Sequence, residues 1–361
     1  MEQVSNNQLN QGRELGKQDA QPLLSIEDLH VSFHTYAGEV HAVRGATYSV
    51  EHGGSLAVVG ESGCGKTVTV QTVMGLTPIP PGEIKGGKII FNGQDLLQLS
   101  EREKQSIRGK DIGMIFQDPM TGLNPTMTVG RQIAETVERH HKVSRNEAME
   151  RAVEMLSLVE IPNPQVRARQ YPHQFSGGMR QRAMIAMALA CEPLLLIADE
   201  PTTSLDVTIQ SQILDLLQNL QERLGMTIVL ISHNLGVVAR LAKSIVVMYA
   251  GKVVESGPAS EIFYNAAHPY TQALLKSVPR LDQEIRGELA TIPGTPPDLF
   301  KPPAGCAFAP RCKYAMKICV NCDAEPIKVG DKHYVSCWLH HEASPNNPLK
   351  NQAENGGRTS D

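Results

Sequence analysis

The sequence has little of what nucleic-acid-binding, membrane-spanning or secreted proteins carry. Aromatic residues make up only 4% of its 361 residues, and 34 basic side chains are matched by 38 acidic ones, which gives a formal charge of −4. This balance argues against a basic surface for duplex DNA, and so few rings argue against a base-stacking surface. The most apolar region, residues 183–198, is interrupted by Glu192-Pro193 and is shorter than the roughly 20 residues of a bilayer span.

A secretory leader is also missing from the N-terminus. Residues 1–22 are polar and rich in Gln and Asn, without the apolar stretch of a signal peptide. We therefore expect a disordered tail and a chain that stays in the cytoplasm. Hydrophobic residues account for 41% of the chain and charged residues for 20%, which is ordinary globular composition. The length predicts one large domain and a smaller one.

Short apolar runs separated by turns begin at residue 23. Residues 24–33, 56–59 and 89–91 have the composition of strands, and residues 67–74 that of a helix. Between about residues 127 and 181, apolar residues recur at helical spacing. The first half of the chain is therefore predicted to be rich in strands and the middle to be helical.

Two continuous apolar runs, residues 194–198 and 227–231, predict buried strands. Residues 208–224 between them predict an amphipathic helix, and residues 244–254 predict a hairpin. Strands that do not alternate between apolar and polar residues are typical of a parallel sheet covered on both faces. The predicted fold class is therefore α/β.

A phosphate-binding loop is predicted at residues 60–67, which fit G-x-x-x-x-G-K-[ST] between a predicted strand and a predicted helix. Glycines let the backbone N–H groups face phosphate oxygens, and the helix that follows adds partial positive charge. Lys66 is placed for the β- and γ-phosphates and the Thr67 hydroxyl for Mg²⁺. A chance glycine turn is the alternative. The predicted ATP-binding residues here are Gly60, Ser62, Gly63, Cys64, Gly65, Lys66 and Thr67, with the Cys64 thiol incidental to the chemistry.

Two carboxylates follow the predicted strand at residues 194–198. Asp199 at the strand end is placed to hold Mg²⁺ or its water ligand. Glu200 is the candidate that orients or deprotonates the attacking water. The alternative is that both side chains only cap the next helix. Together with the phosphate loop, the pair indicates nucleotide hydrolysis and leaves its purpose open.

A second anion-binding element is predicted in residues 175–182, F-S-G-G-M-R-Q-R, at the start of a helix. Ser176, Gly177 and Gly178 offer a hydroxyl, backbone N–H groups and a helix N-terminus to an anion. The segment resembles the signature motif of ATP-binding-cassette (ABC) ATPases, whose usual form is L-S-G-G-Q. Phe175 keeps the apolar character of the first position, whereas Met179 lacks the amide of the last.

Other markers of that family appear in its order along the chain. Gln117 in F-Q-D resembles the Q-loop, residues 203–206 (T-S-L-D) resemble the D-loop, and His233 resembles the H-loop. The resemblance implies that Gln117 approaches Mg²⁺ and the attacking water and that His233 contacts the γ-phosphate. Phe33 matches the aromatic residue that stacks on adenine, and Tyr36 is a weaker choice. Taken singly, these residues also fit a turn, a strand-end histidine and core packing.

The resemblance covers residues 23–270 and implies the P-loop NTPase fold of an ABC ATPase. Such a fold has a RecA-like core, an antiparallel β subdomain and a helical subdomain at about residues 118–180. ATP and Mg²⁺ are the implied cofactors. Two chains facing head to tail would enclose two ATP molecules, each site combining one chain's phosphate loop with the other's Ser-Gly-Gly. Hydrolysis then loosens the pair.

Cysteines are concentrated near the C-terminus, where five of the seven lie between residues 306 and 337. In a reducing compartment such a cluster predicts metal ligands before disulfides. Soft sulfur ligands suit zinc or an iron–sulfur cluster, and the residues alone leave both metals open. Cys322, at C-x2-C spacing, would suit a zinc knuckle, and unligated thiols are the remaining alternative. The four cysteines of the C-x5-C-x6-C-x17-C pattern are Cys306, Cys312, Cys319 and Cys337.

The segment around these cysteines is similar to the C-terminal extension of oligopeptide/dipeptide importer ATPases. The similarity lies in I-P-G-T-P-P at residues 292–297, G-C-A-F-A-P-R-C at residues 305–312 and the closing Cys337-Trp338. It implies a [4Fe–4S] cluster on the four cysteines of that pattern, of structural rather than redox use, with zinc as the alternative and Cys322 outside the set. The extension is expected over residues 271–343, followed by a mobile tail at residues 344–361.

The resemblance as a whole implies the ATP-hydrolysing subunit of a bacterial peptide importer, at the cytoplasmic face of the inner membrane. Its implied partners are a second ATPase subunit, a paralogue rather than a copy, two transmembrane permease subunits and an extracytoplasmic peptide-binding protein. A groove between the Gln117 loop and the helical subdomain would receive the permease. An importer of nickel or another small solute is the alternative, and a soluble ABC protein acting on ribosomes or DNA a more distant one. A simple P-loop kinase would not need residues 175–182.

Overall fold

A computed structural model describes residues 21–118, 122–203, 206–277 and 292–345. Ser204 and Leu205 of the predicted D-loop lie outside the described residues, as do residues 1–20 of the N-terminal tail and residues 346–361 of the C-terminal tail. Within the described ranges, no helix combines the length and the apolar character needed to cross a membrane.

The main sheet has eight strands, of which five are parallel neighbours in the order β6-β7-β8-β3-β9. Every residue of β3, β7 and β8 is buried, so the continuous apolar runs of the sequence correspond to strands covered on both faces. The predicted α/β class with a parallel sheet is confirmed. The strands are β6 Ile112–Ile115, β7 Leu195–Asp199, β8 Thr227–Ser232, β3 Ser55–Val59, β9 Ser244–Tyr249, β10 Lys252–Pro258, β12 His333–Val335 and β11 Ile327–Gly330.

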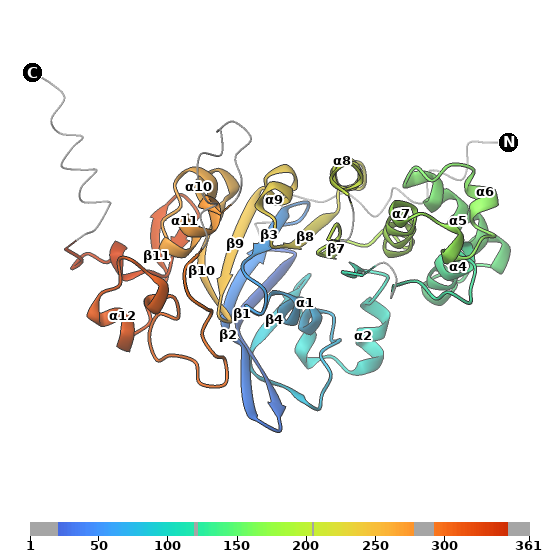
Figure 1. The fold of residues 1–361 in the computed structure, drawn as a ribbon. Coiled ribbons are helices and arrows are strands. Elements are labelled where there is room, and N and C mark those ends of the chain that lie inside the picture. Colours follow the sequence, from blue (N-terminus) through green and yellow to red (C-terminus); the bar gives the residue numbers. More distant parts are fainter. Residues whose placement is uncertain (1–20, 119–121, 204–205, 278–291, 346–361) are drawn as a thin grey trace, which may run out of the picture.

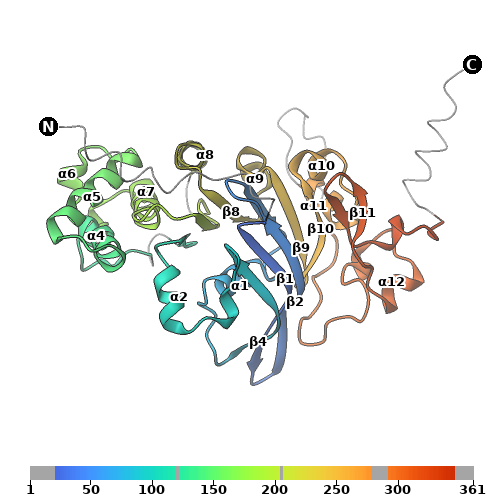
Figure 2. The same cartoon turned by 180° about the vertical axis from the view of Figure 1, so that it is seen from behind.

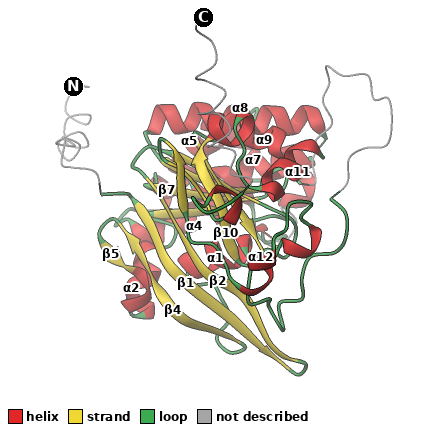
Figure 3. Cartoon of the chain, turned by 90° about the vertical axis from the view of Figure 1, so that its left-hand side faces the viewer, coloured by secondary structure: helices red, strands yellow, loops and turns green. Residues whose placement is uncertain are grey.

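One face of the main sheet is covered by a four-stranded antiparallel sheet and by α1 (Lys66–Val73). Leu56 and Val58 of β3 pack on this side with Val70 of α1 and Val31 of β1. Figure 3 shows β1, β2 and β4 as neighbours in this second sheet. Its strands are β2 Gly38–Val50, β1 Leu24–Thr35, β4 Gly82–Phe91 and β5 Gln94–Asp95. This sheet is the antiparallel subdomain that the resemblance implies.

Helices cover the other face of the main sheet. Ala57 and Val59, which alternate with the β3 residues named above, join a larger core that includes α8 (Val207–Leu224). Four residues of the predicted apolar face of α8, Ile213, Leu216, Leu217 and Leu220, are buried. Asp206 caps the start of α8 by accepting a hydrogen bond from the Ile209 N–H, and Gly225 ends it at φ +62°. The other helices near this face are α7 Gly177–Ala188, α9 Leu235–Leu241, α10 Ala259–Tyr264 and α11 Pro269–Lys276.

The helices of the middle segment gather at one end of the molecule, and the C-terminal segment lies at the other (Figures 1 and 2). A capping box of Ser144 and Glu147 begins α5, because each residue's side chain accepts a hydrogen bond from the other's backbone N–H. The helices at this end are α4 Val129–His140, α5 Arg145–Leu158 and α6 Pro164–Arg167, while α2 Glu101–Ile107 follows the short 3-10 turn Leu96–Gln98.

The C-terminal segment continues the main sheet, because β12 pairs with β10 and β11 pairs with β12. Glu255 on β10 is buried at this junction and accepts hydrogen bonds from the backbone N–H groups of Ala267 (2.6 Å) and His268 (2.9 Å). Its carboxylate also lies 2.8 Å from Nε2 of His333 on β12. The same segment contains α12 Lys317–Asn321 and the 3-10 turns Ala309–Arg311 and Trp338–His340. Sheet pairing and a buried carboxylate therefore join the extension to the core.

Changing Glu255→Gln should destabilise the fold, because one carboxylate oxygen becomes an NH₂ donor facing buried donors. We expect a loss of about 2 kcal/mol at pH 7, measured by urea unfolding. Burial alone raises the pKa of Glu255, but hydrogen bonds from His333 and the backbone outweigh it and hold the pKa below its ordinary value. The difference from wild type should therefore be fully present above the ordinary glutamate pKa and shrink as the pH falls through the lowered folded-state pKa. Glu222→Gln, on the exposed face of α8, is the control.

Candidate nucleotide site

The loop between β3 and α1 is shaped by two glycines that lie against other backbone segments. Gly60 has φ +152°, and a Cβ there would lie 2.2 Å from the carbonyl oxygen of Met248 on β9. Gly65 has φ +96°, and its Cβ would lie 2.4 Å from the carbonyl oxygen of Ala42 on β2. Neither position has room for a side chain, so the predicted phosphate-binding loop is fixed between the two sheets.

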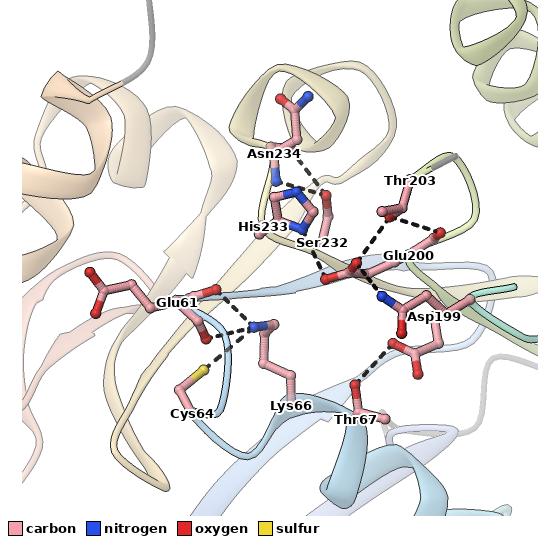
Figure 4. Close-up of polar contacts among 12 residues, drawn as sticks. Glu61, Cys64, Lys66, Thr67, Asp199, Glu200, Thr203, Ser232, His233 and Asn234 are labelled. Carbon is pink, nitrogen blue, oxygen red and sulfur yellow. Dashed lines mark hydrogen bonds and ion pairs between the residues drawn. The ribbon is translucent and has the colours of Figure 1, made fainter. Parts of the chain in front are cut away.

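Lys66 lies over this loop with its side chain buried (Figure 4). Its Nζ donates hydrogen bonds to the carbonyl oxygens of Gly60 (2.8 Å) and Glu61 (2.9 Å), and Sγ of Cys64 is 3.6 Å away. Ser62 and Gly63 are exposed at the loop tip. The amino group thus lies at the centre of the loop, where phosphate oxygens can replace the carbonyls as its acceptors.

Thr67 and Asp199 meet beside the loop. The Thr67 hydroxyl donates to Oδ1 of Asp199 over 3.2 Å, which joins the first turn of α1 to the end of β7 (Figure 4). Burial raises the pKa of Asp199, and the hydrogen bond from Thr67 only partly offsets this. A hydroxyl and a carboxylate oxygen at this distance are ligands of the kind that Mg²⁺ takes, and a bound cation would favour the ionised carboxylate.

Three polar side chains contact the Glu200 carboxylate, two of them from distant parts of the sequence; Figure 4 labels His233 and Thr203. Oε1 of Glu200 lies 2.9 Å from Nδ1 of His233, and its Oε2 accepts hydrogen bonds from Nε2 of Gln117 (2.9 Å) and the hydroxyl of Thr203 (3.0 Å). The Glu200 backbone is left-handed, at φ +47°, and its N–H donates to the carbonyl oxygen of Ile231 on β8. The structure therefore brings together the three predicted catalytic residues.

The surroundings of Glu200 favour its ionised form. Burial alone raises the pKa of Glu200, but hydrogen bonds from His233 and Thr203, together with the nearby Lys66 charge, hold the pKa below its ordinary value. The carboxylate is therefore ionised at neutral pH. Thr203 is a partner that the sequence pattern does not reveal, because it belongs to the predicted D-loop and no spacing rule relates its hydroxyl to Glu200.

The Ser-Gly-Gly motif begins α7, as predicted. Oγ of Ser176 accepts a hydrogen bond from the backbone N–H of Met179 over 3.3 Å, which makes Ser176 the N-cap. Gly178 packs against α8, where a Cβ on residue 178 would lie 2.9 Å from Cγ2 of Ile209.

The two candidates for stacking on adenine differ in exposure. The Phe33 ring packs beside Gly82 at the margin of the core that includes α1 and the antiparallel sheet, while Tyr36 is fully exposed.

The four cysteines of the C-x5-C-x6-C-x17-C pattern line one small cavity with mainly apolar surroundings. Burial raises the pKa of Cys306 to about 11 and that of Cys337 to about 12. Cys322 is exposed and lies outside this cavity. Among the residues that the structure describes, no group of three or more His, Cys, Asp or Glu side chains is arranged to hold a metal ion.

Comparisons with known proteins show the family of this chain. A family model described as ABC transporter matches residues 30–203, and one described as oligopeptide/dipeptide transporter, C-terminal region, matches residues 254–319. An oligopeptide transport ATP-binding protein of Bacillus subtilis is 57% identical over 323 residues, which is 90% of each chain. The chain belongs to the ABC transporter ATP-binding proteins of the oligopeptide and dipeptide group. A dipeptide transport ATP-binding protein of the same organism is 53% identical to this ABC ATPase, over 92% of this chain and 99% of the relative.

Solved structures support the ABC ATPase fold of this chain. The dimeric post-hydrolysis structure of the ATP-binding cassette MJ0796 with ADP and Pi is 25% identical, with a TM-score of 0.59 over 65% of this chain and 98% of that chain. cbiO1 from Clostridium perfringens, part of the ABC transporter complex cbiONQ, is 26% identical, with a TM-score of 0.58 over 68% of this chain and 93% of that chain. The predicted ABC ATPase fold is therefore confirmed.

Changing Gly60→Ala should abolish tight ATP binding by this ABC ATPase, because the new Cβ collides with backbone that is fixed in β9. We expect the dissociation constant for MgATP to rise by at least about tenfold, measured by fluorescence titration. Gly225→Ala is the control, since that glycine also has positive φ but no atom within 4 Å of the added Cβ. It should lower stability slightly and leave ATP affinity unchanged. Equal ATP affinities for both variants would contradict the packing explanation.

Proposed function

We propose that this chain is the ATP-binding and ATP-hydrolysing subunit that powers import of di- or oligopeptides through a membrane ABC transporter. The observation that carries the proposal is the convergence of Gln117, Thr203 and His233 on Glu200, beside the Thr67–Asp199 pair. Family membership supplies the transport context, because relatives over 50% identical are oligopeptide or dipeptide transport ATP-binding proteins.

The residues divide the hydrolytic work among them. Backbone N–H groups of the loop and the Lys66 amino group would hold the phosphates. Thr67, Gln117 and Asp199 would hold Mg²⁺, which would neutralise charge on the phosphates. Glu200 accepts a proton from the attacking water, which Gln117 and His233 orient. Removing that proton makes the water a stronger nucleophile towards the γ-phosphate.

We infer that the working unit is a head-to-tail pair of ATPase subunits. The first turn of α7, capped by Ser176, is a second anion-binding element, and in such a pair it would close over the nucleotide of the other subunit. The similar MJ0796 cassette is a dimer. Two permease subunits would form the path, an extracytoplasmic protein would select the peptide, and this chain would bind the cytoplasmic side. The second ATPase subunit is expected to be a paralogue.

The proposed role of the C-terminal cysteines is to hold a [4Fe–4S] cluster, with zinc as the alternative. Soft thiols are the ligands that such a group takes, and the four thiols line one largely apolar cavity, although they are not arranged around a common metal position. A bound group would stabilise a segment with little core of its own. Three of the four cysteines lie within the part of the chain that matches the family's C-terminal region.

Changing Glu200→Gln should lower ATP turnover by about 10²–10⁴-fold, because the amide cannot accept the proton of the attacking water. MgATP affinity should stay within about threefold of wild type, because the phosphate ligands are untouched. Steady-state hydrolysis and nucleotide titration measure the two effects. Glu222→Gln on the exposed face of α8 is the control. Hydrolysis at the wild-type rate in Glu200→Gln would remove the residue from its role.

Anaerobically purified protein should be brown and contain iron and acid-labile sulfide. Cys312→Ser should lose the colour and the iron, because Cys312 lines the cavity, whereas Cys322→Ser should keep both, because Cys322 is exposed. Absorption spectra and metal analysis decide the outcome. Colourless protein with one zinc per chain would assign the other metal, and metal-free protein would contradict both assignments.

A further inference from the structure

The turn between Cys306 and Cys312 reaches the phosphate-binding loop. Arg311 ends the 3-10 turn Ala309–Arg311, and only 5% of its side chain is exposed. Its two terminal nitrogens donate to the two carboxylate oxygens of Glu61, over 2.7 Å and 3.0 Å. Glu61 is the second residue of the phosphate-binding loop. It lies 250 residues before Arg311 in the sequence. This paired geometry is the strong form of an arginine–carboxylate contact.

Arg311 has no donor left for any other role. A guanidinium has five N–H groups, and five acceptors surround this one. The acceptors are the two Glu61 oxygens, the Tyr249 hydroxyl (3.0 Å) and the carbonyl oxygens of Pro293 (2.9 Å) and Ile292 (3.2 Å). The aromatic rings of Tyr249 and Phe308 are also close, with centroids 5.8 Å from the guanidinium carbon.

Each polar group of Glu61 has a hydrogen-bond partner. Its carboxylate binds Arg311, its backbone N–H donates to the hydroxyl of Tyr270 over 2.8 Å, and its carbonyl oxygen accepts from Nζ of Lys66 over 2.9 Å. The residue that Arg311 fixes is therefore also one that holds the phosphate-binding lysine. A shift of Glu61 would move Lys66 and the N–H groups of the loop tip.

A purely structural role would be to attach the extension to the core. That attachment already exists elsewhere: β12 pairs with β10, Arg44 donates to the carbonyl oxygen of Pro303, and Lys252 forms an ion pair with Asp323. None of these contacts involves the phosphate-binding loop. The Arg311–Glu61 pair differs from them because its acceptor belongs to the loop itself.

We propose that Arg311 is a positioning residue of the nucleotide site, through which the C-terminal extension sets the affinity for ATP. The pair holds Glu61 in the conformation in which the loop and Lys66 accept phosphate. This inference rests on the proposed ATPase function and adds the extension to the nucleotide site. It concerns ATP binding and leaves the chemical step to Glu200.

The experiment compares Arg311→Gln, Arg311→Lys, Glu61→Gln and the double variant in the full chain. Breaking the pair from either side should raise the MgATP dissociation constant and KM by about tenfold and leave kcat at saturating ATP within about twofold of wild type. Arg311→Lys keeps the positive charge but loses the two parallel N–H donors of the guanidinium, so it should raise KM less than Arg311→Gln does. The double variant should be no worse than the single ones, because both remove one interaction.

Arg151→Gln is the matched control, since it breaks the Arg151–Glu192 ion pair (2.6 Å) away from the loop. Its KM should equal that of wild type. Circular dichroism verifies folding, and should Arg311→Gln not fold, Glu61→Gln breaks the same pair from the loop side. Wild-type affinity in folded Glu61→Gln and Arg311→Lys, or additive losses in the double variant, would overturn the proposal. Glu200→Gln lowers kcat rather than raising KM, so the two roles are distinguished.

Discussion

The positions of the nucleotide-site residues depend on the parallel register of four strands, β3, β6, β7 and β8. Val59 at the end of β3 lies opposite Ser232 of β8, and Asp199 at the end of β7 lies opposite Ile231. The carboxyl ends of these strands therefore meet at one edge, where an open parallel sheet places its ligands. The phosphate-binding loop follows β3, Asp199 ends β7, and Glu200 comes directly after it. His233 follows β8 and Gln117 follows β6. Side chains separated by more than a hundred residues share a site because the strands share an edge.

Most of this site could be predicted from the sequence, for a physical reason. A phosphate-binding loop needs its glycines at fixed spacing, and buried parallel strands need unbroken apolar runs, so both are visible in local sequence. Asp199 and Glu200 follow such a run. Gln117 and His233 have no local rule of their own, and their roles follow only from the family resemblance, as do the subdomains.

Contacts between distant segments could not be predicted in this way. The Arg311–Glu61 pair joins a turn in the extension to a loop near the start of the chain, and no spacing relates them. The pairing of β12 with β10 could not be predicted either. The composition of the extension indicates a separate unit, whereas backbone hydrogen bonds join it to the main sheet. Both contacts depend on tertiary geometry.

The Arg311–Glu61 ion pair also couples the two segments energetically. Only 5% of the Arg311 side chain and 25% of the Glu61 side chain are exposed, so removing one partner costs more than the pair contributes, because the remaining charge stays partly desolvated. The loop conformation held by Glu61 and the turn that carries Arg311 are therefore stable together. In the proposed role of Arg311 this coupling is reciprocal. An ordered turn between Cys306 and Cys312 would then favour nucleotide binding by the same factor by which nucleotide favours the ordered turn. A group held by these cysteines would thereby stabilise the extension and strengthen ATP binding together, although it would touch neither phosphate nor Mg²⁺.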